Sequence, residues 1–208
     1  MTQVLEEKFE TLVQDISQRG YAVIDHFLSE DEVKALLNEV HQKFEQGEFK
    51  RAGFGRKETY KVDDDIRGDH IHWIDKEELA SKHTYFDKMD ELIRYINKTC
   101  YLGLKDYEIH FAIYPKGSHY IRHIDQFKNT SKRKLSVICY LNIGWTEKNR
   151  GNLKLYVEDA VTGEETTVNI LPLGGRLVCF ESSKLEHEVE EGTKDRYSIT
   201  GWMLTEEA

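Results

Sequence analysis

Proline, cysteine and long apolar runs are all scarce in this sequence. The 208 residues include two prolines and three cysteines. No run of about 18 apolar residues occurs, so we expect no membrane span. Cys100, Cys139 and Cys179 lie far apart without a CxxC pair, which argues against a disulfide framework or a zinc ribbon and predicts reduced core residues. The N-terminal MTQVLEEKFE has neither the basic nor the apolar stretch of a secretory signal, which predicts a cytoplasmic protein.

Positive charge is also in deficit. Lysine and arginine number 29 against 38 aspartates and glutamates, and the formal net charge is -9. This balance disfavours nonspecific binding to nucleic acid or to an anionic membrane. A local basic rim of Lys128, Lys132, Arg133 and Lys134 can attract an acidic partner, but a solvated loop is the simpler interpretation.

The spacing of apolar residues changes along the chain. In the first part it is helical, with a capping box at Ser29 and Glu32, a short strand YAVIDHF between the first two helices, and a third helix over about 81–99. From Asp106 the period becomes two, in eight short segments separated by turn residues. This predicts one α+β, mainly β domain over 1–208, with helical support and a mobile loop in 1–100 and a jelly-roll barrel over 106–204.

A Gly-rich segment, Arg51 to Gly68, interrupts the helical part and mixes charged with aromatic residues. We expect it to form a long loop or a hairpin. Loops of this length are often functional, so the part from Gly53 to Gly68 is a candidate cover for a binding site.

The segment YIRHIDQF places His123 and Asp125 two residues apart in a predicted strand. Residues two apart in a strand face the same side, so the pair can hold one metal ion or can be two polar residues on a solvated face. Of the remaining histidines, His187 lies in the strand-rich part and is the natural third ligand. Two imidazoles and one carboxylate form the facial triad of non-haem Fe(II) oxygenases, whereas a structural zinc site more often uses cysteine.

Arg196 begins the next predicted strand, RYSITGWML, and shares a face with Ser198, Thr200 and Trp202. An arginine that points into a barrel is costly unless it meets an anion. Its planar guanidinium matches a carboxylate, and 2-oxoglutarate is a dicarboxylate that can also chelate iron. A structural aspartate or glutamate is the alternative partner.

These segments together resemble a known family. From about Asp65 to Trp202 the chain is similar to the prolyl 4-hydroxylase family of 2-oxoglutarate/Fe(II) oxygenases, in particular to hypoxia-inducible-factor prolyl hydroxylases and their bacterial homologues. The matching stretches are DIRGDHIHWID, YPKGSHYIRHID, CYLNIGW and LEHEVEEGTKDRYSITGW. The fold implied is a double-stranded β-helix, a cupin-like jelly roll with supporting N-terminal helices.

The resemblance also implies roles for individual residues. It implies iron ligation by His123, Asp125 and His187, and binding of the distal 2-oxoglutarate carboxylate by Arg196. It also implies cosubstrate contacts by Tyr140, Tyr114 and Thr200, and a pocket contact by Trp202 near the iron. For the covering loop, it implies a pair between Asp69 and Arg133 that links the loop to the barrel, and it places Arg67 in the same region.

The implied reaction is hydroxylation of a prolyl residue at C4 with Fe(II), 2-oxoglutarate and O2, giving succinate and CO2, with ascorbate as a stimulant. The implied partner is an intracellular protein with an accessible proline, for which a translation factor is one candidate. Two alternatives stay open: the same chemistry on a non-prolyl or small-molecule substrate, and a module that binds metal or peptide without turnover. The loop DQFKNTSKRK differs in composition from the animal enzymes, so substrate identity does not carry over.

Overall fold

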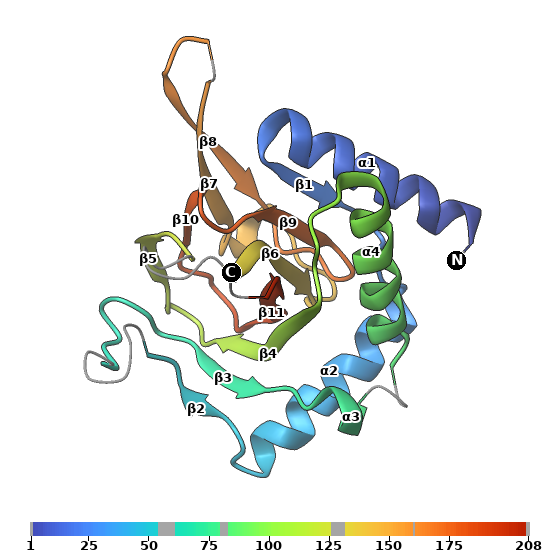
Figure 1. Ribbon diagram of the computed structural model, residues 1–208. Helices are drawn as coiled ribbons and strands as arrows, with labels where there is room; N and C mark the ends of the chain where they lie inside the picture. The colour runs from blue at the N-terminus through green and yellow to red at the C-terminus, as the bar shows by residue number, and fades with distance from the viewer. Residues whose placement is uncertain (1, 54–60, 80–82, 126–131, 160, 207–208) are drawn as a thin grey trace.

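Two antiparallel sheets face each other, and helices cover the outer side of the larger one (Figure 1). The computed structural model describes residues 2–53, 61–79, 83–125, 132–159 and 161–206. The seven-stranded sheet has the order β1-β9-β6-β11-β4-β3-β2, and the four-stranded sheet has the order β5-β10-β7-β8. The strands are β1 (Tyr21–Ile24), β2 (Lys50–Arg51), β3 (His70–Trp73), β4 (Asp106–Tyr114), β5 (Tyr120–His123), β6 (Arg133–Tyr140), β7 (Leu153–Glu158), β8 (Glu165–Ile170), β9 (Leu177–Glu181), β10 (Glu186–Val189) and β11 (Arg196–Leu204).

The helices begin and end at the residues that capping rules favour. α1 (Gln3–Arg19) ends at Gly20, whose φ of 81° lies in the left-handed region that glycine adopts at low cost. α2 (Glu30–Glu45) begins with the predicted capping box, in which Ser29 and Glu32 exchange hydrogen bonds. The other helical segments are α3 (Lys76–Leu79), α4 (Thr84–Cys100) and the short 3-10 turn η2 (Glu147–Asn149). Within the described residues, none of the helices has the length and apolar character needed to cross a membrane.

Alternation along the central strands separates two apolar cores. On β4, Phe111 and Ile113 belong to the core packed against the helices, whereas Ala112 and Tyr114 belong to the core between the sheets. A period of two places successive side chains on opposite faces of a sheet. The predicted switch to strands is therefore confirmed, and β4 to β11 are the eight strands expected after Asp106.

One sequence expectation is wrong, one strand was not predicted, and the predicted covering loop lies partly outside the described residues. Cys139 and Cys179 are buried, but Cys100 is exposed at the C-terminal end of α4, so the prediction that all three are core residues is wrong. The segment before β4 contains β3, an unpredicted strand that pairs with β4 in the larger sheet. Of the predicted covering loop, residues 54–60 lie outside the described part of the chain; its last residues, Arg67 and Gly68, pair with the backbone of 119–120.

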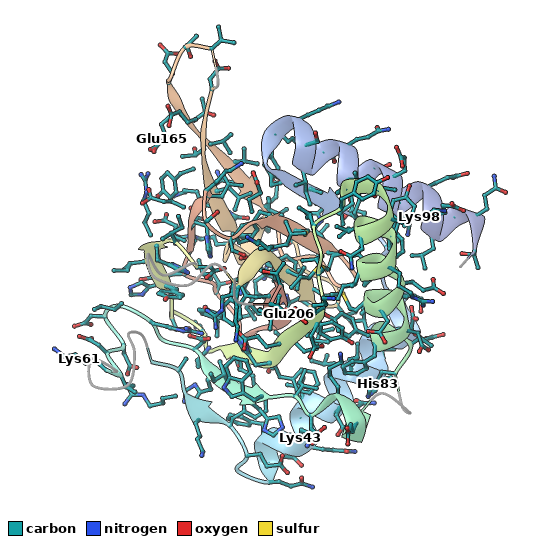
Figure 2. The ribbon with its side chains drawn as sticks, viewed as in Figure 1. Lys43, Lys61, His83, Lys98, Glu165 and Glu206 are labelled. Atoms are coloured by element: carbon teal, nitrogen blue, oxygen red, sulfur yellow. The ribbon has the colours of Figure 1, made fainter. Side chains whose placement is uncertain are left out.

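Strand β5 is only four residues long, and charged side chains fix its outer face. Arg122 donates to Glu186 on β10 at 2.6 Å and to both carboxylate oxygens of Glu165 at 3.0 and 2.6 Å. Its guanidinium also lies 3.7 Å from the centre of the Tyr156 ring. Glu165 begins β8 on the hairpin that projects from the molecule (Figure 2). This network ties β5 to the other strands of the smaller sheet.

Candidate metal centre and its two pockets

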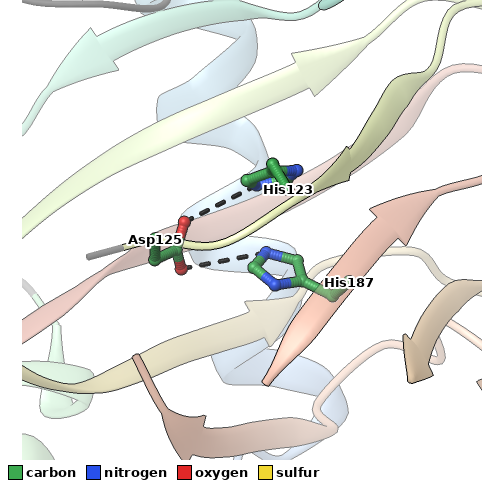
Figure 3. A group of neighbouring side chains, drawn as sticks. All are labelled: His123, Asp125 and His187. Atoms are coloured by element: carbon green, nitrogen blue, oxygen red, sulfur yellow. Dashed lines mark ion pairs between the residues drawn. The ribbon is translucent and has the colours of Figure 1, made fainter. Parts of the chain in front are cut away.

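Three side chains that can ligate a metal converge between the sheets. His123 ends β5, and His187 lies directly opposite it on β10. Asp125 lies two residues beyond β5, and its carboxylate points toward both rings (Figure 3). The structure thus brings together the three residues that the sequence indicates as a metal site.

Asp125 reaches this position by a route that differs from the prediction. The expectation that one strand carries both His123 and Asp125 is wrong, because β5 ends at His123. The Ser136 hydroxyl on β6 instead donates to Oδ2 of Asp125 at 2.6 Å and lies 2.9 Å from the Ser182 hydroxyl. A hydrogen bond from the opposite sheet therefore orients the carboxylate.

The donor atoms have the spacing of a site for one ion. Nε2 of His123 lies 3.6 Å from Oδ1 of Asp125, and Nε2 of His187 lies 3.8 Å from Oδ2. One donor atom from each residue lies within 4.8 Å of the other two. Among the described residues the group contains no cysteine, which argues against a closed structural zinc site. Two imidazoles and one carboxylate fit Fe(II) with open positions.

Backbone carbonyls fix the tautomer of both histidines. Nδ1 of His123 lies 2.8 Å from the carbonyl of Ile121, and Nδ1 of His187 lies 3.3 Å from that of Leu185. Because a carbonyl only accepts, each Nδ1 carries the proton and donates it. The lone pair is then on Nε2, the atom that faces Asp125, and this is the orientation that a metal-binding imidazole requires.

The protonation states also suit metal binding. Burial lowers the pKa of His187 to about 4, although the charge of Asp125 opposes this shift. Burial alone raises the pKa of Asp125, but His187, His123 and the Ser136 hydroxyl outweigh it and hold that pKa well below its usual range. At neutral pH the site therefore has a charged carboxylate and a neutral His187, so neither group has to lose a proton to a metal.

Rows of inward-facing residues on the larger sheet lead away from this centre. Paired residues of antiparallel strands face the same side, so the strand register defines each row. The rows are Arg196 and Tyr114; Ser198, Ala112 and Tyr140; Thr200, His110 and Ile138; and Trp202, Glu108 and Ser136. The small side chains of Ala112 and Ser198 separate Arg196 from the triad.

Arg196 lines an inner pocket together with Tyr114, Thr200 and the three triad residues. It is 2% exposed, and its Nη2 donates to the Tyr140 hydroxyl at 3.3 Å. Its guanidinium lies 5.1 Å from the centre of the Tyr114 ring and 4.9 Å from that of Tyr140. Within the described part of the chain, no carboxylate forms an ion pair with Arg196, and its Nε has no hydrogen-bond partner. The alternative of a structural aspartate or glutamate is therefore not found among these residues.

A second pocket opens on the other side of the triad. It is a cleft of about 600 Å³. Its wall combines apolar and aromatic residues, among them exposed isoleucines and Trp73, with the charged side chains of Arg67, Arg122 and Arg133. The residues that line both this cleft and the inner pocket are Arg67, His110, Tyr120, His123, Asp125 and Trp202. The metal centre thus lies where the inner pocket meets the outer cleft.

The predicted Asp69–Arg133 pair is not formed. Both carboxylate oxygens of Asp69 accept from Arg67, at 2.7 and 3.0 Å. Arg133 instead donates to Glu108 at 2.7 and 2.9 Å and lies 3.4 Å above the Trp202 ring. Asp69 is 1% exposed, so it needs a cation at hand, and Arg67 is two residues away on the same extended segment.

Sequence reasoning missed two residues of the site. Tyr120 stacks on His123, with ring centres 3.6 Å apart and an angle of 16° between the planes. His110 lies in the same row as Thr200 and lines both pockets. A signal for His110 was present, because alternation along β4 from Tyr114 leads through Ala112 to His110 on one face.

Comparisons with known proteins agree with this geometry. Residues 109–204 match the family model of the 2OG-Fe(II) oxygenase superfamily. The crystal structure of a Pseudomonas putida prolyl-4-hydroxylase is 36% identical, with a TM-score of 0.81 over 95% of this chain and 99% of that one. A prolyl hydroxylase from Trichoplax adhaerens, solved with a hypoxia inducible factor peptide fragment, is 30% identical, with a TM-score of 0.84 over 97% and 91% of the two chains.

A curated human protein, Egl nine homolog 1, is 32% identical over 213 residues, which cover 96% of this chain and 47% of the relative. The chain therefore spans less than half the length of that relative. The metal site and the two pockets described above fit the cofactors of this superfamily, Fe(II) and 2-oxoglutarate. With a solved relative covered almost end to end at 36% identity, the chain belongs to the prolyl 4-hydroxylase family of 2OG-Fe(II) oxygenases.

Proposed function

We propose that this protein hydroxylates a prolyl residue at C4 in a protein substrate, with 2-oxoglutarate and O2 as cosubstrates and succinate and CO2 as products. The observation that carries the proposal is the position of the triad between a cleft of about 600 Å³ and an inner pocket lined by a buried arginine, which has no ion-pair partner among the described residues. A cleft of this size is typical of ligand-binding sites. The similarity to two prolyl hydroxylases supports the choice of proline.

In this proposal the inner pocket binds 2-oxoglutarate. Arg196 pairs with the distal carboxylate, because a buried guanidinium without an anion has a strong preference for one. The Tyr140 hydroxyl, 3.3 Å from Arg196, donates to the same carboxylate. Tyr114 forms one wall, and Thr200 lies one row from Ser198 on the way to the triad. The other end of the cosubstrate then faces His123, Asp125 and His187.

The outer cleft binds the peptide. Trp202 supplies an apolar wall near the triad, and Arg133 covers one face of its ring while paired with Glu108. Arg67 lies over the Tyr120 ring at 4.8 Å and is paired with the buried Asp69, which fixes the segment that enters β3 against the start of β5. These contacts keep Tyr120 stacked on the iron ligand His123. The peptide thus meets a rigid wall beside the metal.

Bound Fe(II) supplies the activation of O2 and the oxidation of the cosubstrate that the reaction needs. The chain supplies orientation and exclusion of water. His123 and His187 present unprotonated Nε2 atoms, and the Ser136 hydroxyl orients Asp125. Because Arg196 is buried, the cosubstrate carboxylate would bind in a water-poor environment, where its pairing with Arg196 is strong.

Two other functions make different predictions. An oxygenase with a small-molecule or non-prolyl substrate would release succinate but leave protein prolines unmodified. A module without turnover would bind metal or peptide and release no succinate. The similarity to two prolyl hydroxylases, one of them solved with a peptide fragment, favours a peptide over a small metabolite, and the complete triad favours turnover.

The test has two stages. Protein with Fe(II), 2-oxoglutarate and ascorbate is assayed for succinate, first alone and then with a cell lysate, and proteins of the lysate are searched by mass spectrometry for prolines that gain one oxygen. We expect slow succinate release alone, faster release with lysate, and one modified proline in an intracellular protein, for which a translation factor is a candidate. Succinate without modified proline would favour a different substrate, and its absence would favour a non-catalytic module.

A further inference from the structure

His110 is a buried histidine on β4, and neither metal binding nor the proposed binding of cosubstrate and peptide uses it. It is 1% exposed, and neither of its ring nitrogens has a hydrogen-bond partner in the described structure. Buried polar groups in native proteins nearly always have partners, and an unpaired one lowers stability. Its two free nitrogens therefore point to a ligand or a water that completes them.

The position of His110 limits what that partner can be. It pairs in register with Thr200 on β11 and with Trp73 on β3. The neighbouring row contains Ser136, the residue that orients Asp125. The Trp73 ring centre lies 5.0 Å away and the Trp202 ring centre 5.8 Å away. The ring lines both the outer cleft and the inner pocket. His110 thus belongs to the wall of the cleft directly beside the metal centre, with both of its ring nitrogens buried.

A second unpaired polar group lies beside it. Nε1 of Trp202 is buried and has no hydrogen-bond partner among the described residues. The wall formed by Trp73, His110 and Trp202 therefore contains three buried nitrogens that have no hydrogen-bond partner among the described residues, within an otherwise aromatic cluster. A hydrocarbon occupant would leave these atoms unsatisfied, whereas an occupant with alternating acceptors and donors would satisfy them.

A peptide main chain has this alternation. A neutral imidazole offers one N–H and one lone pair, and each amide offers one C=O and one N–H. The cosubstrate is a poorer match, because Arg196, two rows away, and the Tyr140 hydroxyl, one row away, provide the cationic and donor groups for its carboxylate. Trp73, the cross-strand neighbour of His110, lines the outer cleft and not the inner pocket.

We propose that His110 is a specificity-determining residue that hydrogen-bonds a main-chain amide of the bound peptide and so sets which residue faces the metal centre. The inference rests on the proposed function. It adds a polar contact to the aromatic wall. It also predicts that the position of the peptide along the cleft depends on the His110 side chain.

The test compares variants on the peptide that contains the modified proline, identified with the wild-type protein as above. His110→Phe keeps a ring that packs between Trp73 and Trp202 but removes both nitrogens. We expect the KM for the peptide to rise about tenfold, as for one hydrogen bond to a bound ligand, and a growing share of product at neighbouring residues. The KM for 2-oxoglutarate should change by less than about twofold, because its carboxylate contacts lie at the other end.

Conservative variants and a matched control separate recognition from packing. His110→Asn places an amide near the position of Nδ1, and His110→Gln places one near that of Nε2, so recovery by one of them identifies the nitrogen that binds. His72→Phe is the control, because His72 lies on β3 but packs against Phe49. We expect wild-type values for the control. Anaerobic binding of the peptide, followed by tryptophan fluorescence, gives a readout that does not require turnover.

The possible results separate a failure of the proposed function from a failure of the role given to His110. If the wild-type protein modifies no protein proline, the proposed function fails and the role of His110 fails with it. If the wild type is active but His110→Phe has an unchanged peptide KM and unchanged product position, only the inference is overturned and the nitrogens serve a water. A rise confined to the KM for 2-oxoglutarate would also overturn it, since the partner would then be the cosubstrate.

Discussion

Ser136 donates a hydrogen bond of 2.6 Å to Asp125. A residue of the seven-stranded sheet thus orients the metal-binding carboxylate, which lies just after β5 of the four-stranded sheet. Two of the three ligands thus depend on pairing within one sheet, and the third depends on contact between the sheets. Interactions of this kind, one step removed from the metal, typically change affinity by about 10- to 100-fold.

Replacement of Ser136 by alanine should weaken metal binding without removing it. The variant loses the hydroxyl that orients Asp125, and we expect the Kd for Fe(II) or Co(II) to rise about tenfold. Anaerobic titration, followed by the absorption of bound Co(II), measures this change. Ser182→Ala is the matched control, because it leaves the Ser136–Asp125 bond in place and should have the smaller effect. Equal Kd values for Ser136→Ala and the wild type would contradict this account of Asp125.

Replacement of His187 by alanine should abolish metal binding and turnover while the fold is retained. His187 is one of three ligands, but the strands around it belong to an apolar core that needs no metal to assemble. We expect succinate formation to fall by more than about 100-fold, with an unchanged circular dichroism spectrum. His41→Ala, on the exposed face of α2, should behave as the wild type. Normal turnover by His187→Ala would show that the triad is wrongly assigned.

Replacement of Arg196 by alanine should weaken 2-oxoglutarate binding by about 2 kcal/mol or more, which is the order of a lost buried, charge-assisted pair. Isothermal titration of the metal-loaded, oxygen-free protein measures the affinity. Arg196→Lys keeps the charge but loses the planar guanidinium, so an intermediate value is expected. If affinity does not change in either variant, another cation binds the distal carboxylate.

The metal-free protein should lose stability as the pH falls from about 6.5 to about 4. Burial lowers the pKa of His110 to about 4 from an ordinary value of 6.5. Between these values the unfolded chain binds the proton and the folded chain does not, so the free energy of unfolding decreases as the pH falls. For one such histidine the full change is roughly 3 kcal/mol.

Denaturant unfolding of the wild type and of His110→Phe, at pH values between 4 and 7 with a chelator present, tests this prediction. The variant lacks the titrating ring, so its stability should fall less over the same range. Parallel curves for the two proteins would mean that His110 is protonated in the folded state as readily as in the unfolded one.

Much of the fold could be predicted from local patterns. Alternation of apolar residues after Asp106 predicts the eight strands, and capping signals at Ser29 and Gly20 predict helix ends, because both depend on neighbours in the sequence. Strand β3 escaped prediction because it follows a charged, Gly-rich segment, and its pairing with β4 is a long-range contact. The exposure of Cys100 likewise depends on what α4 packs against.

The metal ligands were identified correctly, but part of the reason was wrong. Strand periodicity suggested that His123 and Asp125 share a face, whereas Asp125 owes its position to Ser136, eleven residues later in the chain. The Asp69–Arg133 pair failed for a related reason, since each side chain has a closer partner that spacing cannot reveal: Arg67 for one and Glu108 for the other. Residue identity predicted the chemistry, and tertiary contacts determined its geometry.

The buried guanidinium of Arg196, which has no ion-pair partner among the described residues, has a consequence for the lifetime of the protein. A ligand that binds only the folded state raises the melting temperature in proportion to the logarithm of its concentration. If 2-oxoglutarate is that ligand, a cell poor in this metabolite would contain a protein that not only works more slowly but also unfolds and is degraded sooner. The melting temperature and the protease resistance of the protein would then rise and fall with the 2-oxoglutarate concentration of the cell.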